Sequence, residues 1–236
     1  EQQRLAGQYI VIPRRFFVDG RLMASVLSLN TLTRAEYRGQ QVFTRLAEAV
    51  YEECRKQNKY FCYGAPNQNS FHGFIKKLAF DNIGKVPLYL KILNPYRLIC
   101  DKIHIPYKHT SSEIKYSDRK AEHNQKEDLQ IVEVTDKNIY LFDLFWERIR
   151  YKYSVIGVRD AEYIKWRYLH MPLREYTLYM AVQNQKPLGY IIGRISEVAG
   201  MRCGMLVDFL VVKGKHTAAN MLLDKIISDF KKHRIG

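Results

Sequence analysis

The stretch that most constrains this chain is residues 27–54, where an apolar strand pattern passes through a basic turn into an amphipathic helix. The helical part carries apolar residues on one face, at Val42, Phe43, Leu46, Ala47, Val50 and Cys54. The first turn of such a helix has backbone N–H groups without intrahelical acceptors, and it is the positive end of the helix dipole. A strand that leads into this end through Arg38 and Gly39 predicts a binding site for a phosphate or pyrophosphate.

Residues 37–43, Tyr-Arg-Gly-Gln-Gln-Val-Phe, resemble the pyrophosphate-binding loop of the GNAT N-acyltransferase superfamily, which follows the pattern Arg/Gln-x-x-Gly-x-Gly/Ala. Arg38 occupies the first position, whereas Gln41 and Phe43 stand at the two glycine positions. Gln41 is the larger departure, because glycine lets a backbone approach a ligand closely. The alternative interpretation is an ordinary strand–helix unit of an α/β protein.

A second motif follows in the order that the superfamily has. Residues 59–63 predict a strand, and residues 64–70, Gly-Ala-Pro-Asn-Gln-Asn-Ser, lead into a short helix that ends near Phe80. Asn67 and Ser70 resemble the superfamily's Asn-x-x-Ala/Ser helix start, and Ala79 replaces the glycine of its Leu-Gly-Phe-like turn. Two motifs in the right order are more specific than either alone, and they favour the acyltransferase-like interpretation.

The segments around these motifs predict a sheet. Residues 8–17 and 22–29 predict two strands joined by an Asp19-Gly20 hairpin turn, with Pro13 at a bulge or an edge. Residues 82–93 predict a further strand. By resemblance, a complete domain has a strand and one or two helices before the hairpin. The chain is therefore expected to be a fragment or to supply those elements from elsewhere in its sequence.

Residues 96–128 are polar and charge-mixed, and they predict a linker or excursion between two domains. After them we expect a strand at 129–134, a helix from Thr135 or Asp136 to about residue 153, and a helix at 161–169 capped by Asp160. Strands at 176–182, 188–195 and 203–212 and a final helix capped by Thr217 should follow. Residues 159–168 are similar to a segment of tandem acyltransferase-like bacterial proteins.

The expected fold is α/β (α+β), with two acyl-CoA N-acyltransferase-like domains, each a mixed, mostly antiparallel sheet flanked by helices. Residues 1–95 would form the first domain, without its first strand and helices, and residues 129–236 a second, degenerate one. In the second domain Lys213-Gly-Lys-His stands where the Arg-x-x-Gly pattern would be.

The net charge of +14 is spread over the chain, with +7 in residues 1–95, +1 in 96–128 and +6 in 129–236. An anionic cofactor suits this distribution as well as a nucleic acid does, so a nucleic-acid partner is not expected. The four cysteines predict reduced, buried thiols in a cytoplasmic protein. No apolar run is long enough for a membrane span, and the scattered histidines predict no metal site.

The resemblance implies acetyl-CoA as co-substrate, held by two sets of residues. Backbone groups of Leu29 and Thr31 would pair with its pantetheine arm, and the other contacts would come from Arg38, Gly39, Gln40, Gln41, Val42, Phe43, Thr44, Asn67 and Ser70. Acetyl transfer to an amine needs a base and an acid. Many superfamily members take the acid from a tyrosine of the helix after Asn67, a position that Phe74 fills here, so Tyr63 is the remaining candidate. The strand before the loop has no carboxylate, and its Ser28 and Asn30 could only hold a water.

The predicted function is therefore transfer of an acetyl or other acyl group from acetyl-CoA to an amine of a small molecule or peptide. Two alternatives remain open: a non-catalytic module that binds CoA or another ligand, favoured by Gln41 and Phe74, and an aminoacyl transferase that uses aminoacyl-tRNA. The sequence leaves the acceptor and the oligomeric state undefined.

Overall fold

The computed structural model describes residues 4–93, 95, 128–198 and 200–233, so most of the expected linker at 96–128 lies outside the described residues. The fold is α+β, with two four-stranded sheets and, in the described part, five α-helices. The chain divides into two compact units, Glu1–Leu88 with Arg150–Val158 (unit 1) and Tyr89–Ile149 with Arg159–Gly236 (unit 2). None of the described helices combines the length and the apolar character that crossing a membrane requires.

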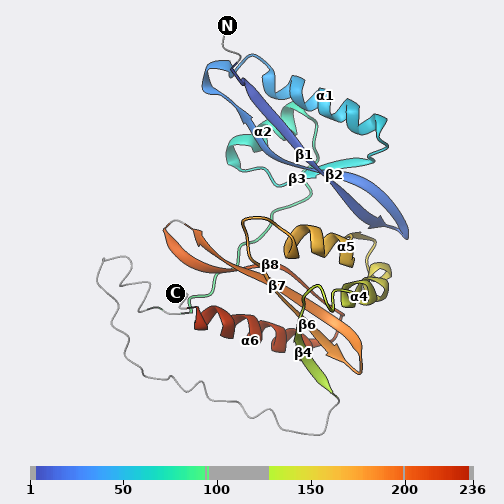
Figure 1. Ribbon diagram of the computed structural model, residues 1–236. Coiled ribbons are helices and arrows are strands. Elements are labelled where there is room, and N and C mark those ends of the chain that lie inside the picture. Colours follow the sequence, from blue (N-terminus) through green and yellow to red (C-terminus); the bar gives the residue numbers. More distant parts are fainter. Residues whose placement is uncertain (1–3, 94, 96–127, 199, 234–236) are drawn as a thin grey trace. The chain divides into compact units, whose positions relative to one another are not determined.

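The sheet of unit 1 has the strand order β3-β2-β1-β5, of which Figure 1 labels β1, β2 and β3. Its strands are β1 (Gly7–Val18), β2 (Arg21–Thr33), β3 (Phe61–Gly64) and β5 (Val155–Gly157). The expected hairpin joins β1 and β2 through Asp19 and Gly20, whose φ angles of 43° and 81° suit a tight turn between twisted strands. β3 runs parallel to β2, because a helix crosses over between them.

Strand β5 comes from late in the chain and pairs only with Phe16–Val18 of β1. The remainder of β1 has no neighbour on that edge among the described residues, and Pro13 lies there in regular register opposite Val26. Of the two positions expected for this proline, the edge is the correct one, and the missing N–H costs no ladder hydrogen bond there.

Two helices, α1 (Val42–Lys56) and α2 (Gln68–Lys77), pack on one face of this sheet. The core between them consists of Tyr9, Ala47 and Phe74, surrounded by Val11, Phe43, Leu46, Val50, Tyr51, Leu78 and Phe80. Gly73 allows α2 to approach α1 closely, because a Cβ there would lie 3.2 Å from the Phe43 ring. The amphipathic helix predicted at 42–54 is confirmed.

The strand predicted at residues 82–93 is wrong: residues 81–92 form no strand and no helix. Val86, Leu88 and Leu90 are more than four-fifths exposed. Aliphatic side chains at every second position describe one face of a strand, but this pattern does not supply a neighbouring strand to pair with. Leu93, at the end of the segment, packs instead against the core of unit 2.

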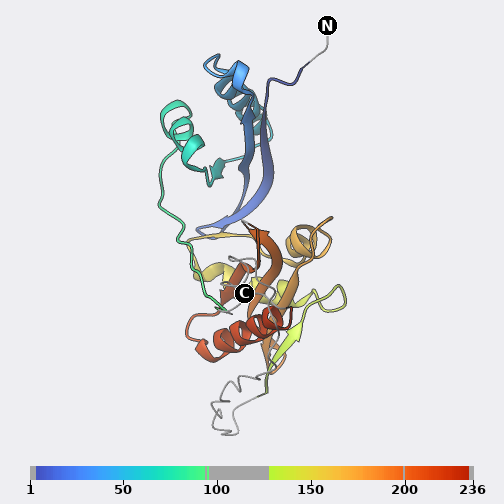
Figure 2. The same ribbon diagram turned by 90° about the vertical axis from the view of Figure 1, so that its left-hand side faces the viewer.

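Unit 2 contains an antiparallel sheet in the order β4-β6-β7-β8. Its strands are β4 (Leu129–Glu133), β6 (Thr177–Gln183), β7 (Lys186–Val198) and β8 (Met201–Val211). The helix α6 (His216–Lys232) covers one face, while α4 (Leu141–Ile149) and α5 (Ala161–Ile164) lie on the other (Figure 2). The expected strands at 129–134, 176–182, 188–195 and 203–212 are therefore confirmed, with longer β7 and β8.

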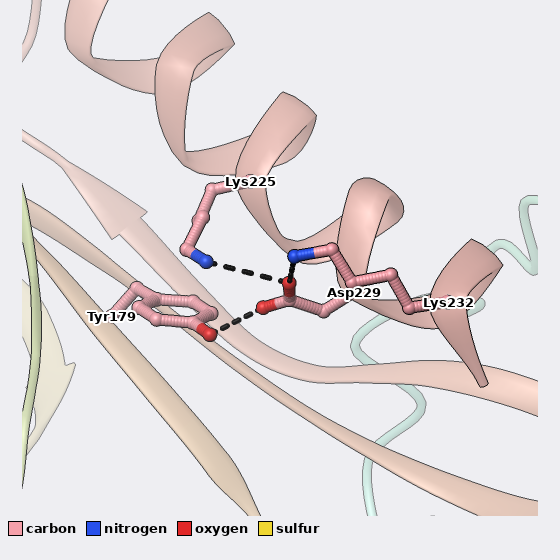
Figure 3. Close-up of polar contacts among 4 residues, drawn as sticks. All are labelled: Tyr179, Lys225, Asp229 and Lys232. Atoms are coloured by element: carbon pink, nitrogen blue, oxygen red, sulfur yellow. Dashed lines mark hydrogen bonds and ion pairs between the residues drawn. The ribbon is translucent and has the colours of Figure 1, made fainter.

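The helix α6 is held by an apolar stripe and by a polar cluster. Ala218, Leu222, Ile226 and Phe230 are buried on one face, as the periodicity predicts. On its flank the Asp229 carboxylate accepts hydrogen bonds from the Tyr179 hydroxyl, from Lys225 Nζ at 3.3 Å and from Lys232 Nζ at 3.4 Å (Figure 3). This cluster ties the last turns of α6 to strand β6.

Two helix starts in unit 2 differ from the prediction. The helix expected from Thr135 or Asp136 begins at Leu141, because Asn138 accepts from Thr135 N at 2.8 Å and donates to Glu133 O at 2.9 Å, which forms a turn instead. It ends at Ile149 in a 3₁₀ turn. Thr217 is not a cap, since α6 begins one residue earlier and its first turn has no side-chain cap.

Asp160 does cap its helix, by accepting from Tyr163 N at 2.8 Å. That helix continues beyond Ile164 as a π-helical turn, Lys165–Leu169. Cys54, Cys62 and Cys203 are free thiols, as expected, but they are half-buried rather than buried. Cys100 lies outside the described residues.

Candidate functional site

The loop that enters α1, residues 38–44, is called the cradle here. Gly39 and Gln41 both adopt left-handed backbone, with φ of 80° and 58°. Gln41 is the residue before the helix, and its carbonyl accepts from Arg45 N at 3.0 Å. The amides of Val42, Phe43 and Thr44 have no intrahelical acceptor because they stand at the helix start, and no side chain caps them. The cradle is thus a set of free N–H donors at the positive end of a 15-residue helix.

The loop before the cradle is braced by its own contacts. A 3₁₀ turn, Ala35–Tyr37, ends with Arg38 N donating to Ala35 O at 3.2 Å, and the Gln40 side chain donates to Glu36 O at 3.1 Å. The Arg38 side chain is exposed and has no carboxylate partner among the residues that the structure describes. Its charge therefore remains available for an anion above the helix start.

Strand β2 has a free edge that leads to the cradle. The β2–β3 ladder ends at the pair Ser28–Gly64, which we call the vertex, whereas β2 continues to Thr33. Among the strands that the structure describes, none pairs with Leu29–Thr33 on that side, a length of about 16 Å at the usual rise. A bulge opposite Tyr9 interrupts the β1–β2 register there, with Asn30 left-handed at φ 48°.

The structure places the other predicted residues in different surroundings. Asn67 accepts from Ser70 N at 3.0 Å and from Ser70 Oγ at 3.1 Å, so both residues cap α2. Tyr63 pairs with Leu27 and lies on the sheet face opposite α1 and α2, where its ring meets Phe16 at 5.1 Å. The cradle and the Leu29–Thr31 edge therefore lie on one continuous path, and Tyr63 lies on the far face of the sheet.

A buried row of proton-bearing groups lies under the vertex, and we call it the polar row: Ser28, Tyr9, Tyr51 and Cys62. Ser28 Oγ lies 2.9 Å from Tyr9 Oη, Tyr9 Oη is bonded to Tyr51 Oη, and Cys62 Sγ lies 4.0 Å from Tyr51 Oη. Burial raises the pKa of Tyr9, of Tyr51 and of the Cys62 thiol, so all keep their protons at neutral pH. The sequence alone does not reveal this row, because no local pattern links residues from β1, β2, α1 and β3.

Unit 2 contains a partly buried ion pair in the motif that the sequence singled out. Arg159 Nε lies 3.1 Å from Asp208 Oδ2, and the Tyr168 hydroxyl donates to the same oxygen at 3.4 Å. Asp208 lies beside a bulge of β8. The ion pair and the Tyr168 hydrogen bond tie residues 159–168 to β8. Within the described residues, no group of three metal-binding side chains occurs anywhere in either unit.

Comparison with known proteins agrees with this geometry. Residues 1–75 match the family model described as "Acetyltransferase (GNAT) domain", a stretch that includes the cradle, the free edge and most of α2. The match covers 75 of the 236 residues, the part of the chain that contains the cradle. A search of curated proteins gave no match to the sequence.

Solved structures with a similar fold align along nearly the whole chain. Saccharomyces cerevisiae N-myristoyltransferase, solved with bound myristoyl-CoA and inhibitors, is 12% identical with a TM-score of 0.56, and the match covers 100% of this chain and 58% of that one. A probable N-acyltransferase from Enterococcus faecalis is 14% identical with a TM-score of 0.54, covering 98% and 50%. A GCN5-related N-acetyltransferase from Anabaena variabilis is 13% identical with a TM-score of 0.54, covering 97% and 51%.

At these identities the likeness concerns the fold alone. The chain spans between half and three-fifths of the length of these structures.

Proposed function

We propose that unit 1 binds an acyl-CoA and transfers its acyl group to an amine, with acetyl-CoA as the simplest donor. The observation that carries the proposal is the continuous path from the cradle to the vertex. Donors for a pyrophosphate lie at one end, an unpaired strand edge lies along the middle, and the vertex lies at the other end. The family match over residues 1–75 and the myristoyl-CoA in the yeast structure support the same ligand class.

Each residue of the path has a proposed role. The amides of Val42, Phe43 and Thr44 bind the pyrophosphate oxygens, Arg38 neutralises their charge, and Gly39 and Gln41 set the loop backbone. Backbone groups of Leu29 and Thr31 pair with the amides of the pantetheine arm. Gln40, Asn67 and Ser70 shape the site by bracing the loop and the start of α2. Tyr63 stays a candidate acid only if the acceptor enters from the far face.

We also infer that unit 2 is a second, degenerate acyltransferase-like domain. Its order of strand, two helices, three strands and helix, from β4 to α6, supports this assignment, as does the bulge of β8. The short turn before α6, with Gly214 at φ 83°, has no counterpart of Arg38 and its braced loop. In this arrangement only unit 1 binds the cofactor.

A non-catalytic binding module is the second candidate, and Phe74 favours it. Its side chain is 4% exposed and packs against Phe43 and Phe80, so α2 offers no acid at that position. The experiment that separates the candidates is thiol release from acetyl-CoA over a panel of small amines and lysine-containing peptides. Acyl transfer predicts amine-dependent release, whereas a binding module predicts affinity without release. Binding of aminoacyl-tRNA in place of acetyl-CoA would support the aminoacyl route.

A further inference from the structure

The hydrogen bonds of the polar row under the vertex can run in either of two directions, and this choice suggests a further role for the row. Its four groups carry four protons and share three hydrogen bonds, so when all three bonds run in the same direction the group at one end donates outside the row. In one direction Ser28 donates to Tyr9 and Tyr9 to Tyr51, while the Cys62 thiol donates away from Tyr51 to Tyr63 O at 3.9 Å. In the other direction Cys62 donates to Tyr51, and the last donor is the Ser28 hydroxyl at the vertex.

In each direction the last donor of the row needs an acceptor outside the row. The first uses the Tyr63 carbonyl oxygen, which the protein itself supplies. The second requires an oxygen at the vertex, because Ser28 must then donate away from Tyr9. Hydrogen-bonded hydroxyls reverse direction by rotation alone, and such rows polarise cooperatively in a low-dielectric interior.

The vertex has room for such an oxygen because Gly64 has no side chain. An added Cβ at Gly64 would lie 3.3 Å from Ser28 O and 3.7 Å from Ser28 Cβ, directly over the serine. Ser28 itself is 5% exposed, so its hydroxyl lies in surroundings that exclude most water. A donor in such a site stabilises developing negative charge more strongly than one in water.

We propose that Ser28 donates a hydrogen bond to the thioester carbonyl oxygen of the bound acyl-CoA, and that Tyr9 and Tyr51 orient it by reversing the polar row. This inference rests on the proposed acyl-CoA binding by unit 1. Ser28 touches the reacting group, while Tyr9 is a positioning residue. When the amine attacks, electron density moves onto the carbonyl oxygen, and the Ser28 hydrogen bond strengthens. No proton leaves the row.

The test uses the 236-residue chain and acetyl-CoA labelled with carbon-13 at the thioester carbonyl. Calorimetry first measures binding, and infrared difference spectra then locate the carbonyl band of the bound ligand. The inference predicts a lower carbonyl frequency in the wild type than in Ser28→Ala, with Tyr9→Phe in between. Ser25→Ala is the matched control, since Ser25 is a buried serine of the same strand on the opposite face. It should keep the wild-type band.

A second variant leaves the four side chains of the polar row unchanged and adds a methyl group at Gly64, beside Ser28. Gly64→Ala should weaken acetyl-CoA binding roughly tenfold or more, because its methyl group overpacks the vertex. It should leave binding of adenosine 3′,5′-bisphosphate, which fills only the cradle end, unchanged. With an active acceptor, Ser28→Ala should lower kcat about 10- to 100-fold at similar KM.

Equal carbonyl bands in wild type and Ser28→Ala, with both binding acetyl-CoA, would overturn this inference and leave the proposed function standing. Equal losses of the two ligands in Gly64→Ala would also overturn it. Absence of acetyl-CoA binding by the folded wild type would remove the proposed function, and this inference with it.

Discussion

Gly39 and Gln41 lie two residues apart in the cradle, and both hold the backbone in the left-handed region, at φ of 80° and 58°. A side chain in that region costs about 1 kcal/mol, whereas glycine adopts it freely. The superfamily pattern has glycine at the position of Gln41, and the structure gives the physical reason: the backbone conformation, rather than close packing alone, favours glycine there.

Gln41→Gly should therefore keep the free energy of unfolding within about 1 kcal/mol of the wild type, because relief of strain offsets the added chain entropy. It should also preserve acetyl-CoA affinity. Gln40→Gly is the matched comparison, since Gln40 is not among the positive-φ residues and its side chain braces the loop. Urea denaturation should show it to be the less stable variant; the reverse order would contradict the strain argument.

Phe74→Ala should destabilise unit 1 by about 3–5 kcal/mol, because it removes a buried ring from the core that α1, α2 and Tyr9 share. Phe71 is 42% exposed on the same helix, and Phe71→Ala should cost less than about 1 kcal/mol. Hydrogen exchange of the α2 and β2 amides measures the difference. Similar losses in the two variants would contradict the core assignment of Phe74.

The Asp229 cluster should make part of the stability of unit 2 dependent on pH. Burial raises the pKa of Asp229, but hydrogen bonds from Tyr179 and Lys225 outweigh this and hold the pKa below its usual value. A carboxylate with a lowered native pKa contributes stability above its unfolded pKa of about 3.9 and loses it as pH falls through the native pKa. Asp229→Asn should then cost roughly 1 kcal/mol at pH 7.

That cost should remain constant down to about pH 5 and diminish below about pH 4. Tryptophan fluorescence is a suitable probe, because the two tryptophans, Trp146 and Trp166, both belong to unit 2. Lys232→Gln is the milder comparison, since it removes one of the three donors. A stability difference that grows as the solution is acidified would contradict the assigned direction of the pKa shift.

The partly buried Arg159–Asp208 pair should contribute more to stability than an exposed pair does. Arg159→Met removes the charged hydrogen-bond donor of a carboxylate that is 11% exposed, so unit 2 should lose about 1.5–3 kcal/mol, measured by the same fluorescence signal in urea. Arg55→Met breaks the exposed pair with Glu52 and should change stability by less than about 1 kcal/mol. A small effect of Arg159→Met would show that the pair is dispensable.

The parts of the fold that sequence predicted are those that local patterns specify. Apolar spacing located α1 and α6, Asp19-Gly20 located the hairpin, and the polar side chain of Asp160 located the start of α5. The predictions were wrong or incomplete where a strand forms only if a neighbouring strand, distant in sequence, pairs with it. Residues 82–93 have a strand pattern without a neighbouring strand. Strand β5 has only three residues, and it pairs with β1, which lies far away in the sequence.

The same distinction applies to the candidate site. The cradle is a local strand–turn–helix feature, so its residues could be named from sequence. The polar row could not, because Tyr9 meets Ser28 and Tyr51 only after three elements have packed together. Asn67 and Ser70 form a local pattern that is visible in the sequence but ambiguous, since it suits both a ligand contact and a helix cap.

The most direct test of the account is calorimetric titration of the folded chain with acetyl-CoA, beside Arg38→Ala and the control Arg55→Ala from the other end of α1. The account predicts micromolar binding by the wild type and by Arg55→Ala. Arg38→Ala should bind at least about tenfold more weakly, because a charge-assisted hydrogen bond is lost. No binding by the wild type, or equal binding by all three proteins, would contradict the assignment of the cradle as the cofactor site.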